Sequence, residues 1–313
     1  MQAATTTTTQ TQTMAQPRAM AATRTDRLRK AVLPYLYVLP AALFVIAFLL
    51  YPMVVTVGQA FTHWDGITEP TFVGLQNFTD LFGDAHFITS LKNTLIWTVA
   101  AVVLPVSLGL LLAITLNTVR WSGLFKSIIY LPATVSAAAV GILFTFVFAY
   151  DNGALNAILN AFGFKSVRWL FEAPTNTFSM IAAYTWQSTG LNLMLFLVGL
   201  QGLPPEPIEA AKLDGCTGLN LVWRIIIPMM MPFVVIATLL AVINGFKVFD
   251  LIWVMTQGGP GRASETLAVT MYREGFILFN QGYSAAIAVI IALAALLFSY
   301  FYLRSVLDQE KQI

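Results

Sequence analysis

The sequence contains few charged residues. Charged residues make up 10% of the 313 positions, 17 Lys and Arg against 15 Asp and Glu, whereas 58% are hydrophobic and the mean hydropathy is +0.74. A soluble globule has about 25% charged residues, which cover its surface. The scarcity of charge therefore excludes a soluble globule and predicts an integral membrane protein. The net charge of +2 is too small to indicate binding to nucleic acid.

Residues that commonly hold metals or carry out catalysis are equally scarce. The one cysteine, Cys216, cannot form an internal disulfide or build a multi-cysteine metal site. His63 and His86 lie far apart in sequence and are interpreted as loop residues. The sequence has no G-x-x-x-x-G-K-[ST] phosphate loop and no Ser/His/Asp or Cys/His arrangement. We therefore expect no catalytic residue, no metal ligand and no bound cofactor, and a membrane enzyme is a poor explanation.

Six intervals free of charged residues predict where the chain crosses the membrane. Each can hold the roughly 20 apolar residues that a spanning helix requires, and backbone groups that face lipid must be satisfied within their own helix. We therefore expect an all-α integral membrane protein. Its six transmembrane helices should lie near residues 34–58, 93–116, 127–149, 178–200, 229–254 and 281–303.

The distribution of Lys and Arg predicts the orientation and the division of the chain. Most of these residues fall in segments that are cytoplasmic if the N-terminus is inside, so both termini are expected in the cytoplasm. The tail contains an unbroken threonine run, Thr5–Thr9, and no apolar face, so it should be disordered. A cleaved signal peptide is not expected, because the first apolar segment is long enough to span the membrane. The expected parts are a disordered tail (1–30), a first transmembrane helix (31–60), an extracytoplasmic loop (61–90), a core of five helices (91–305) and a cytoplasmic tail (306–313).

The segment between the fourth and fifth expected helices is rich in proline and glycine. Prolines within 204–207 end the preceding membrane helix, because they lack a backbone donor and restrict their predecessors. Residues 209–214 should then form a short helix that stops at Gly215. A second short helix is expected over 219–227, and Pro228 suits the first turn of the next span. The result is a compact helical elbow that projects into the cytoplasm.

The same segment resembles the EAA motif of permease subunits in bacterial ATP-binding cassette importers. Glu209-Ala210-Ala211 is followed after three residues by Gly215 and after nine more by Ile225-x-Ile227-Pro228, with isoleucine at 227 where the family usually has leucine. In that family the elbow is the coupling helix, which docks into a groove of the cytoplasmic ATPase. By resemblance, Glu209 faces basic groups of the groove, the alanines allow close packing, and Gly215 makes the turn. The residues that the resemblance implies for coupling are Glu209, Ala210, Ala211, Asp214, Gly215, Ile225 and Pro228.

Two further motifs resemble carbohydrate permeases of the maltose/glycerol-phosphate type, and this resemblance runs from about residue 35 to the C-terminus. Phe72-Val73-Gly74-Leu75-x-Asn77-Phe78, together with Asn93-Thr94, looks like the outer segment that enters the core. Phe249-Asp250-Leu251-Ile252 and Thr256-Gln257-Gly258-Gly259-Pro260 look like the end of the fifth span. The Gly-Gly-Pro turn also has a local explanation, because it breaks a helix. The combination implies the sugar-type subfamily rather than amino-acid or metal importers.

Polar side chains fall inside the expected fourth and fifth helices, where burial in lipid is costly. Tyr184 and Ser188 share a face of the fourth helix, and Asn244, Lys247 and Asp250 are spaced three apart in the fifth. Two such stripes could bind sugar hydroxyls, or they could join helices to one another, and Lys247 could simply neutralise Asp250. Spacing from the EAA glutamate and from Pro228 also matches substrate-lining positions of the maltose permease. Together with Lys247, these give the expected substrate pathway: Tyr184, Gln187, Ser188, Leu191, Ala241, Asn244, Gly245, Lys247 and Val248.

The resemblance implies a transmembrane permease subunit of an ATP-binding cassette importer for a sugar or oligosaccharide. Its implied location is the inner or plasma membrane of a bacterium or archaeon, which it crosses several times. Its implied partners are a second, similar permease in a heterodimer, two ATP-binding subunits that hold ATP and Mg²⁺, an extracytoplasmic solute-binding protein and membrane lipid, with no nucleic acid.

Two alternatives remain open at this point. A permease of the same family for glycerol phosphate or its phosphodiesters would need several cationic groups on the pathway, and only Lys247 offers one. A gradient-driven secondary transporter would show inverted repeats and an intramembrane carboxylate for ion coupling. The halves show no repeat, and Asp250 is the one acidic residue placed within an expected span.

Overall fold

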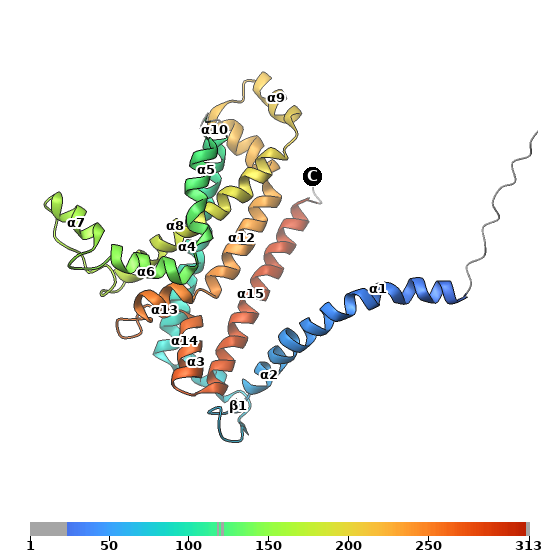
Figure 1. Ribbon diagram of the computed structural model, residues 1–313, viewed down its shortest axis with the longest axis vertical. Helices are drawn as coiled ribbons and strands as arrows, with labels where there is room; N and C mark the ends of the chain where they lie inside the picture. The colour runs from blue at the N-terminus through green and yellow to red at the C-terminus, as the bar shows by residue number, and fades with distance from the viewer. Residues whose placement is uncertain (1–23, 118, 120–121, 311–313) are drawn as a thin grey trace, which may run out of the picture. The chain divides into compact units, whose positions relative to one another are not determined.

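The computed structural model describes residues 24–117, 119 and 122–310, and the chain divides into two compact units, residues 1–54 and 55–313 (Figure 1). In the first unit, α1 (Arg24–Val45) continues through a π-helical turn, Ile46–Leu50, into α2 (Tyr51–Gln59), which crosses the boundary between the units. The segment Tyr35–Gln59 is long and apolar enough to cross a membrane.

Both ends of the described chain are helical where a tail was expected. Helix α1 begins at Arg24, so residues 24–30 are helical, and the rest of the expected N-terminal tail lies outside the described residues. Helix α15 (Gln281–Glu310) likewise takes in residues 306–310, and residues 311–313 lie outside.

The second unit is a helical bundle with one small hairpin. Strands β1 (Thr62–His63) and β2 (Thr71–Phe72) pair antiparallel. The other elements are α3 (Gln76–Gly83), α4 (Ala85–Leu116), α5 (Ser122–Tyr130), a 3-10 turn (Leu131–Thr134), α6 (Ala137–Val147), α7 (Ala154–Ala161), α8 (Thr175–Gln201), α9 (Pro205–Leu213), α10 (Gly218–Leu221), a π-helical turn (Val222–Ile226), α11 (Ile227–Met229), α12 (Met231–Phe246), α13 (Asp250–Thr256), α14 (Leu267–Tyr272), a second π-helical turn (Arg273–Ile277) and α15.

Helix α4 is the central element of this unit, because it packs against both α8 and α12. Glycines allow the helices to approach closely at both crossings, as is common between membrane helices. A Cβ atom on Gly109 of α4 would lie 2.5 Å from the Cβ of Asn192 in α8. A Cβ atom on Gly245 of α12 would lie 2.6 Å from the Cα of Thr98 in α4. Both crossings therefore require glycine at these positions, because a larger residue would push the two helices apart.

The loops of the second unit gather at opposite ends of the bundle. Helices α9 and α10 lie at one end, whereas β1 and α3 lie at the other, and α6 and α7 extend to one side (Figure 1). The elbow and the segment 61–90 thus lie at opposite ends of the bundle, and their placement on opposite sides of a membrane stays a prediction.

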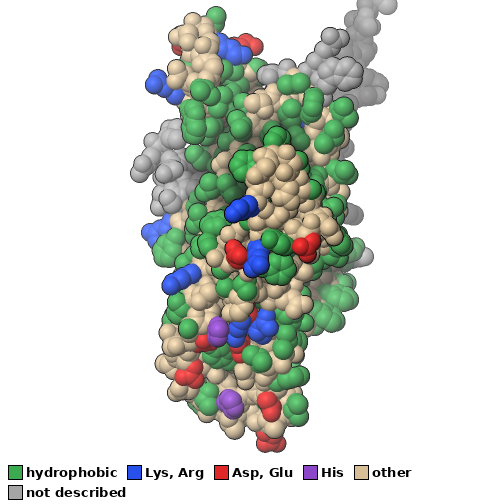
Figure 2. Space-filling view, turned by 90° about the vertical axis from the view of Figure 1, so that its left-hand side faces the viewer, with side chains coloured by type: hydrophobic (Ala, Val, Ile, Leu, Met, Phe, Trp, Pro, Cys, Tyr) green, Lys and Arg blue, Asp and Glu red, His purple; other side chains and the backbone are tan. Residues whose placement is uncertain are grey.

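The surface and the helix lengths identify a membrane protein. Hydrophobic side chains cover much of the face in Figure 2, and charged side chains are scattered singly or in small groups. Within the described residues three helices are long and apolar enough to span, or up to five if each bent pair counts as one span. Helix α8 has 27 residues but is not among these candidates. The sixth crossing and the location of the termini stay predictions.

Two of the expected spans are not straight helices. In place of one helix over 127–149, the segments Ser122–Thr134 and Ala137–Val147 meet at 101°. Ser136 lies at this bend and caps α6, since its hydroxyl accepts a hydrogen bond from the N–H of Ala139. The expected helix over 229–254 begins at a 75° bend between Gly218–Met229 and Met231–Phe246, and it is interrupted at 247–249, where the chain is non-helical before α13.

Candidate functional site

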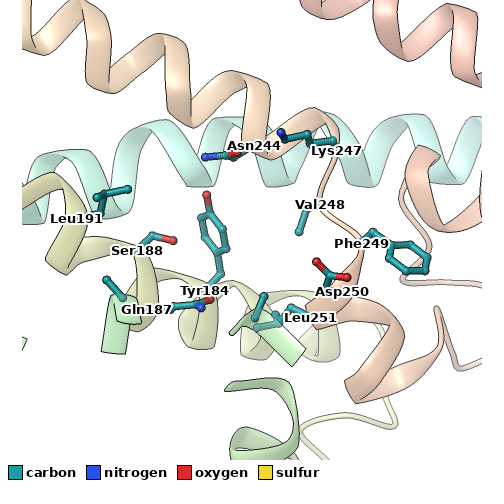
Figure 3. A pocket seen from close by; sticks show the side chains of 12 residues that line it. Tyr184, Gln187, Ser188, Leu191, Asn244, Lys247, Val248, Phe249, Asp250 and Leu251 are labelled. Carbon is teal, nitrogen blue, oxygen red and sulfur yellow. The ribbon is translucent and has the colours of Figure 1, made fainter. Parts of the chain in front are cut away.

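A cavity of about 280 Å³ lies where α8, α12 and the non-helical segment 247–249 meet (Figure 3). It is lined by Ala133, Ala137, Tyr184, Gln187, Ser188, Leu191, Asn244, Lys247, Val248, Phe249, Asp250 and Leu251. A smaller cavity of about 50 Å³ shares Tyr184, Ser188, Leu191 and Asn244 with it and extends between α4, α8 and α12. The site therefore combines hydroxyl, amide and charged groups in one concave surface, the usual setting for a small-molecule ligand.

Most of the residues expected on a substrate pathway meet at this cavity. Tyr184, Gln187, Ser188, Leu191, Asn244, Lys247 and Val248 all line it, and Ala241 lines the smaller cavity. Gly245 lines neither, because it is buried at the crossing with α4. The contact of any of these residues with a substrate stays a prediction.

Sequence reasoning did not place Phe249, Asp250 and Leu251 in the site. Asp250 belongs to the polar stripe of the fifth span, which the sequence predicts as one continuous helix. Because the chain leaves the helical conformation at 247–249, these neighbouring residues all reach the same cavity, which helical periodicity does not allow. The hydroxyl of Thr266 holds the segment by donating a hydrogen bond to the carbonyl of Val248 at 2.9 Å.

Some polar groups of the cavity already form hydrogen bonds within the protein, and others do not. Gln187 donates from its side-chain amide to the carbonyl of Val135 at 2.8 Å, which fixes the bend before α6. The hydroxyl of Tyr184 points toward the side chain of Asn244 (Figure 3). In the part of the chain that the structure describes, Lys247 and Asp250 form no ion pair with each other or with any other residue. The alternative that Lys247 and Asp250 simply neutralise each other thus has no ion pair between them to support it.

A fully buried tryptophan supports the wall of the cavity. Trp97 of α4 packs edge-on against the ring of Tyr184, with 5.7 Å between the ring centroids. Its indole N–H has no hydrogen-bond partner among the described residues, although the side chain is 0% exposed. Tyr184 is thus positioned by aromatic packing from α4, a contact that the sequence pattern did not indicate.

The end of the bundle that bears β1 contains a cluster of four charged residues that sequence reasoning missed. Glu265 is 0% exposed and accepts hydrogen bonds from Arg262 at 2.9 Å and from Arg273 at 2.5 Å. Arg262 also pairs with Glu274 at 3.1 Å. Partial burial opposes the charged form of Arg262, but the carboxylates of Glu265 and Glu274 outweigh it and raise the pKa of Arg262. The loop between α13 and α14 is therefore fixed by charge pairing.

The motif residues near the start of the core anchor the same loop. The side-chain amide of Asn93 donates to the carbonyls of Ala263 and Glu265, each at 2.8 Å. The hydroxyl of Thr94 accepts from the N–H of Leu267 at 2.9 Å. Asn77 in turn donates to the carbonyls of residues 60 and 62. Their part in the fold is thus to connect helices to loops.

The elbow is a helix that ends in a glycine-dependent turn. It begins at Pro205 rather than at the expected residue 209, because proline is tolerated in the first turn of a helix. At its other end the N–H of Cys216 bonds to the carbonyl of Ala211, and the N–H of Gly215 bonds to that of Lys212. Gly215 has φ = +80°, the left-handed conformation that this helix ending requires.

The elbow exposes large apolar side chains that nothing covers within the described chain. The exposed fractions of Leu213, Leu219 and Trp223 are 89%, 76% and 68%. Glu209, Ala210 and Gly215 are also exposed, whereas Ala211 and Ile225 are half-buried. Exposed apolar groups in a cluster mark a surface for a partner.

Comparison with known proteins decides the family. A family model described as the binding-protein-dependent transport system inner membrane component matches residues 105–312. The chain belongs to this family. It is 33% identical over 280 residues to the arabinooligosaccharides transport system permease protein AraP of Bacillus subtilis, covering 88% of each chain. It is 32% identical to the sn-glycerol-3-phosphate transport system permease protein UgpA of Agrobacterium fabrum, covering 90% of this chain and 96% of that one.

A solved structure shares the fold of this permease. A chain of a bacterial alginate ABC transporter, crystallised in complex with an alginate pentasaccharide-bound periplasmic protein, is similar with a TM-score of 0.78. The match covers 88% of this chain and 96% of that chain, at 24% identity. The protein is therefore a membrane-embedded transport permease and not an enzyme.

Proposed function

We propose that this permease translocates a sugar or oligosaccharide through an ATP-binding cassette importer. The observation that carries the proposal is the cavity between α8 and α12, where hydroxyl and amide groups converge beside an aromatic ring. Such groups bind sugar hydroxyls by hydrogen bonding. The similarity to AraP favours the same class of ligand.

The proposed assembly contains this chain, a second similar permease, two ATP-binding subunits and an extracytoplasmic solute-binding protein, in the plasma membrane of a bacterium or archaeon. The apolar surface of the elbow is the proposed contact with an ATP-binding subunit, which holds ATP and Mg²⁺. Closure of the ATP-binding subunits would move α9 and bias the bundle between inward-facing and outward-facing states. The solute-binding protein would contact the end of the bundle that bears β1 and deliver the ligand to the cavity.

Affinity purification of the tagged complex in mild detergent tests the assembly. We expect wild type to recover an ATP-binding subunit and a second permease, and Gly215→Asp to lose the ATP-binding subunit alone. An aspartate at φ = +80° disfavours the turn after α9 and adds a charge to the docking surface.

Gly163→Asp is a matched control for that experiment. Gly163 also has φ = +80°, and a Cβ there would meet no atom within 4 Å, as at Gly215. Because it follows α7 and lies outside the elbow, this variant should retain all partners. A wild-type chain that emerges alone or only as a homo-oligomer would contradict the proposed assembly.

Asn244→Leu should lower the initial rate of sugar uptake about tenfold while assembly and thermal stability stay unchanged. Within the described residues no hydrogen bond engages the Asn244 side chain, so its loss costs the fold little and removes a group available to the ligand. Ile243→Leu on the same helix, which lines neither cavity, is the control. Uptake at the wild-type rate by Asn244→Leu would remove the residue from the pathway.

A second candidate function is transport of glycerol phosphate. The unpaired ammonium group of Lys247 in the cavity and the similarity to UgpA both favour it. Phosphate recognition normally uses several cationic or bidentate donors, and Lys247 is the one Lys or Arg that lines this cavity. Uptake of labelled sn-glycerol 3-phosphate in preference to uncharged saccharides would establish this second function.

A further inference from the structure

We propose that Lys247 and Asp250 together make the cavity selective for an uncharged, polyhydroxylated ligand, and that Asp250 is the residue that excludes anions. This inference rests on the proposed function, because it assumes that the cavity is the ligand site. It assigns Asp250, which the sequence pattern left outside the substrate pathway, to ligand selection.

Lys247 begins the non-helical segment 247–249, and Asp250 directly follows it. Lys247 follows the last residue of α12 and Asp250 is the first residue of α13, and both side chains are exposed to the cavity. Figure 3 shows the ammonium group on the side of Asn244 and the carboxylate on the opposite side of Val248. Each charge therefore remains available to a ligand.

The sum of these charges favours a neutral ligand. A bound anion would be attracted by Lys247 but repelled by the carboxylate of Asp250, and like charges brought together across a binding surface are costly. A bound cation would be attracted by Asp250 and repelled by Lys247. A neutral ligand with several hydroxyls can satisfy both groups, since the ammonium group offers three donors and the carboxylate only acceptors.

The remaining lining residues agree with hydroxyl recognition. Ser188, Tyr184 and Asn244 add groups that both donate and accept hydrogen bonds, and Phe249 adds an apolar face. A zwitterion could also bridge Lys247 and Asp250. It would leave the Asn244 amide on the α12 wall without a partner, so the uncharged polyol is the better fit.

Saturation-transfer NMR on the detergent-solubilised permease complex, without binding protein, tests the inference, because it detects weak ligands directly. The probes are three uncharged saccharides (arabinotriose, maltotriose and raffinose), sn-glycerol 3-phosphate as the anion, and glycine betaine as the zwitterion. We expect wild type to give signals from at least one uncharged saccharide and none from the other two probes.

Asp250→Asn should weaken the saccharide signal roughly tenfold and allow sn-glycerol 3-phosphate to bind. Lys247→Gln should weaken the saccharide signal without admitting the anion.

Asp151→Asn and Lys165→Gln are the matched controls, because they remove the same charges from exposed residues that do not line the cavity. Both should behave as wild type. Binding of sn-glycerol 3-phosphate or glycine betaine to wild type, silence from all three saccharides, or an unchanged ligand pattern in Asp250→Asn would each overturn the inference. Partner recovery by the tagged complex is measured separately, so an importer that assembles, binds an uncharged saccharide and also binds the anion contradicts this inference alone.

Discussion

The double variant Arg262→Met/Arg273→Met should lower the midpoint temperature of unfolding in detergent by roughly 6–20 °C. Both arginines donate to Glu265, which is 0% exposed, so their removal leaves a buried carboxylate whose remaining side-chain donor is Thr270. Removing the partner of a buried charge costs about 3–5 kcal/mol, and each kcal/mol lowers the midpoint by about 2–4 °C in a chain of 150–250 residues.

The triple variant that adds Glu265→Met distinguishes two causes of the lowered midpoint, the unpaired charge and the altered packing. It removes the unpaired carboxylate while keeping an unbranched side chain, so it should regain at least half of the lost temperature. Arg168→Met serves as the control, because Arg168 pairs with Glu172 at 3.9 Å on the surface and such pairs contribute little. If the triple variant melts no higher than the double, the loss arises from packing and the charge argument fails.

Gly245→Val should strongly destabilise the crossing of α12 with α4. The added side chain would meet the backbone of Thr98, with the new Cβ 2.6 Å from its Cα, and neither helix can move aside without opening the core around α4. Overpacking of this kind costs about 1–3 kcal/mol, occasionally more. The measurements are the unfolding midpoint and the rate of uptake, and both should fall.

Two further variants test that reasoning. Gly58→Val in α2 introduces the same side chain where a Cβ meets no atom within 4 Å, and it should be tolerated. Adding Thr98→Ala to Gly245→Val should not restore the midpoint, because the obstruction is the Thr98 backbone. Full recovery would show that the threonine side chain is the obstacle and that the crossing can adapt.

The sequence predicts the helical class and the elbow because both have strong local causes. Intervals without charge coincide with long apolar helices at Tyr35–Gln59, Ala85–Leu116 and Gln281–Arg304. Gly215 ends α9 because few residues other than glycine adopt its positive φ. A glycine directly after a short run of helix-forming residues therefore predicts this helix end from the sequence. The family follows from the same segment, and the matching family model confirms it.

The helix interruptions could not be predicted with the same ease. The residues around 135–136 and 247–249 are mostly apolar, so hydropathy does not distinguish a bent segment from a straight span. Pro132 and Ser136 did provide a signal, a turn followed by a helix cap, that a search for charge-free intervals overlooks. The charged cluster around Glu265 offers no such signal. It depends on close packing, since a Cβ on Gly258 would lie 2.4 Å from the Cγ of Glu265.

The segment 247–249 also determines where water can be located inside the protein. At the end of α12 and the start of α13, backbone carbonyl and N–H groups lose their helical partners, and Thr266 replaces one of them, at Val248. Within a membrane, such backbone is tolerated only where protein buries it or where it lines a water-filled space. The cavity that these residues line gives water access to this backbone. A ligand that enters replaces that water with hydrogen bonds of its own, which an apolar molecule cannot do.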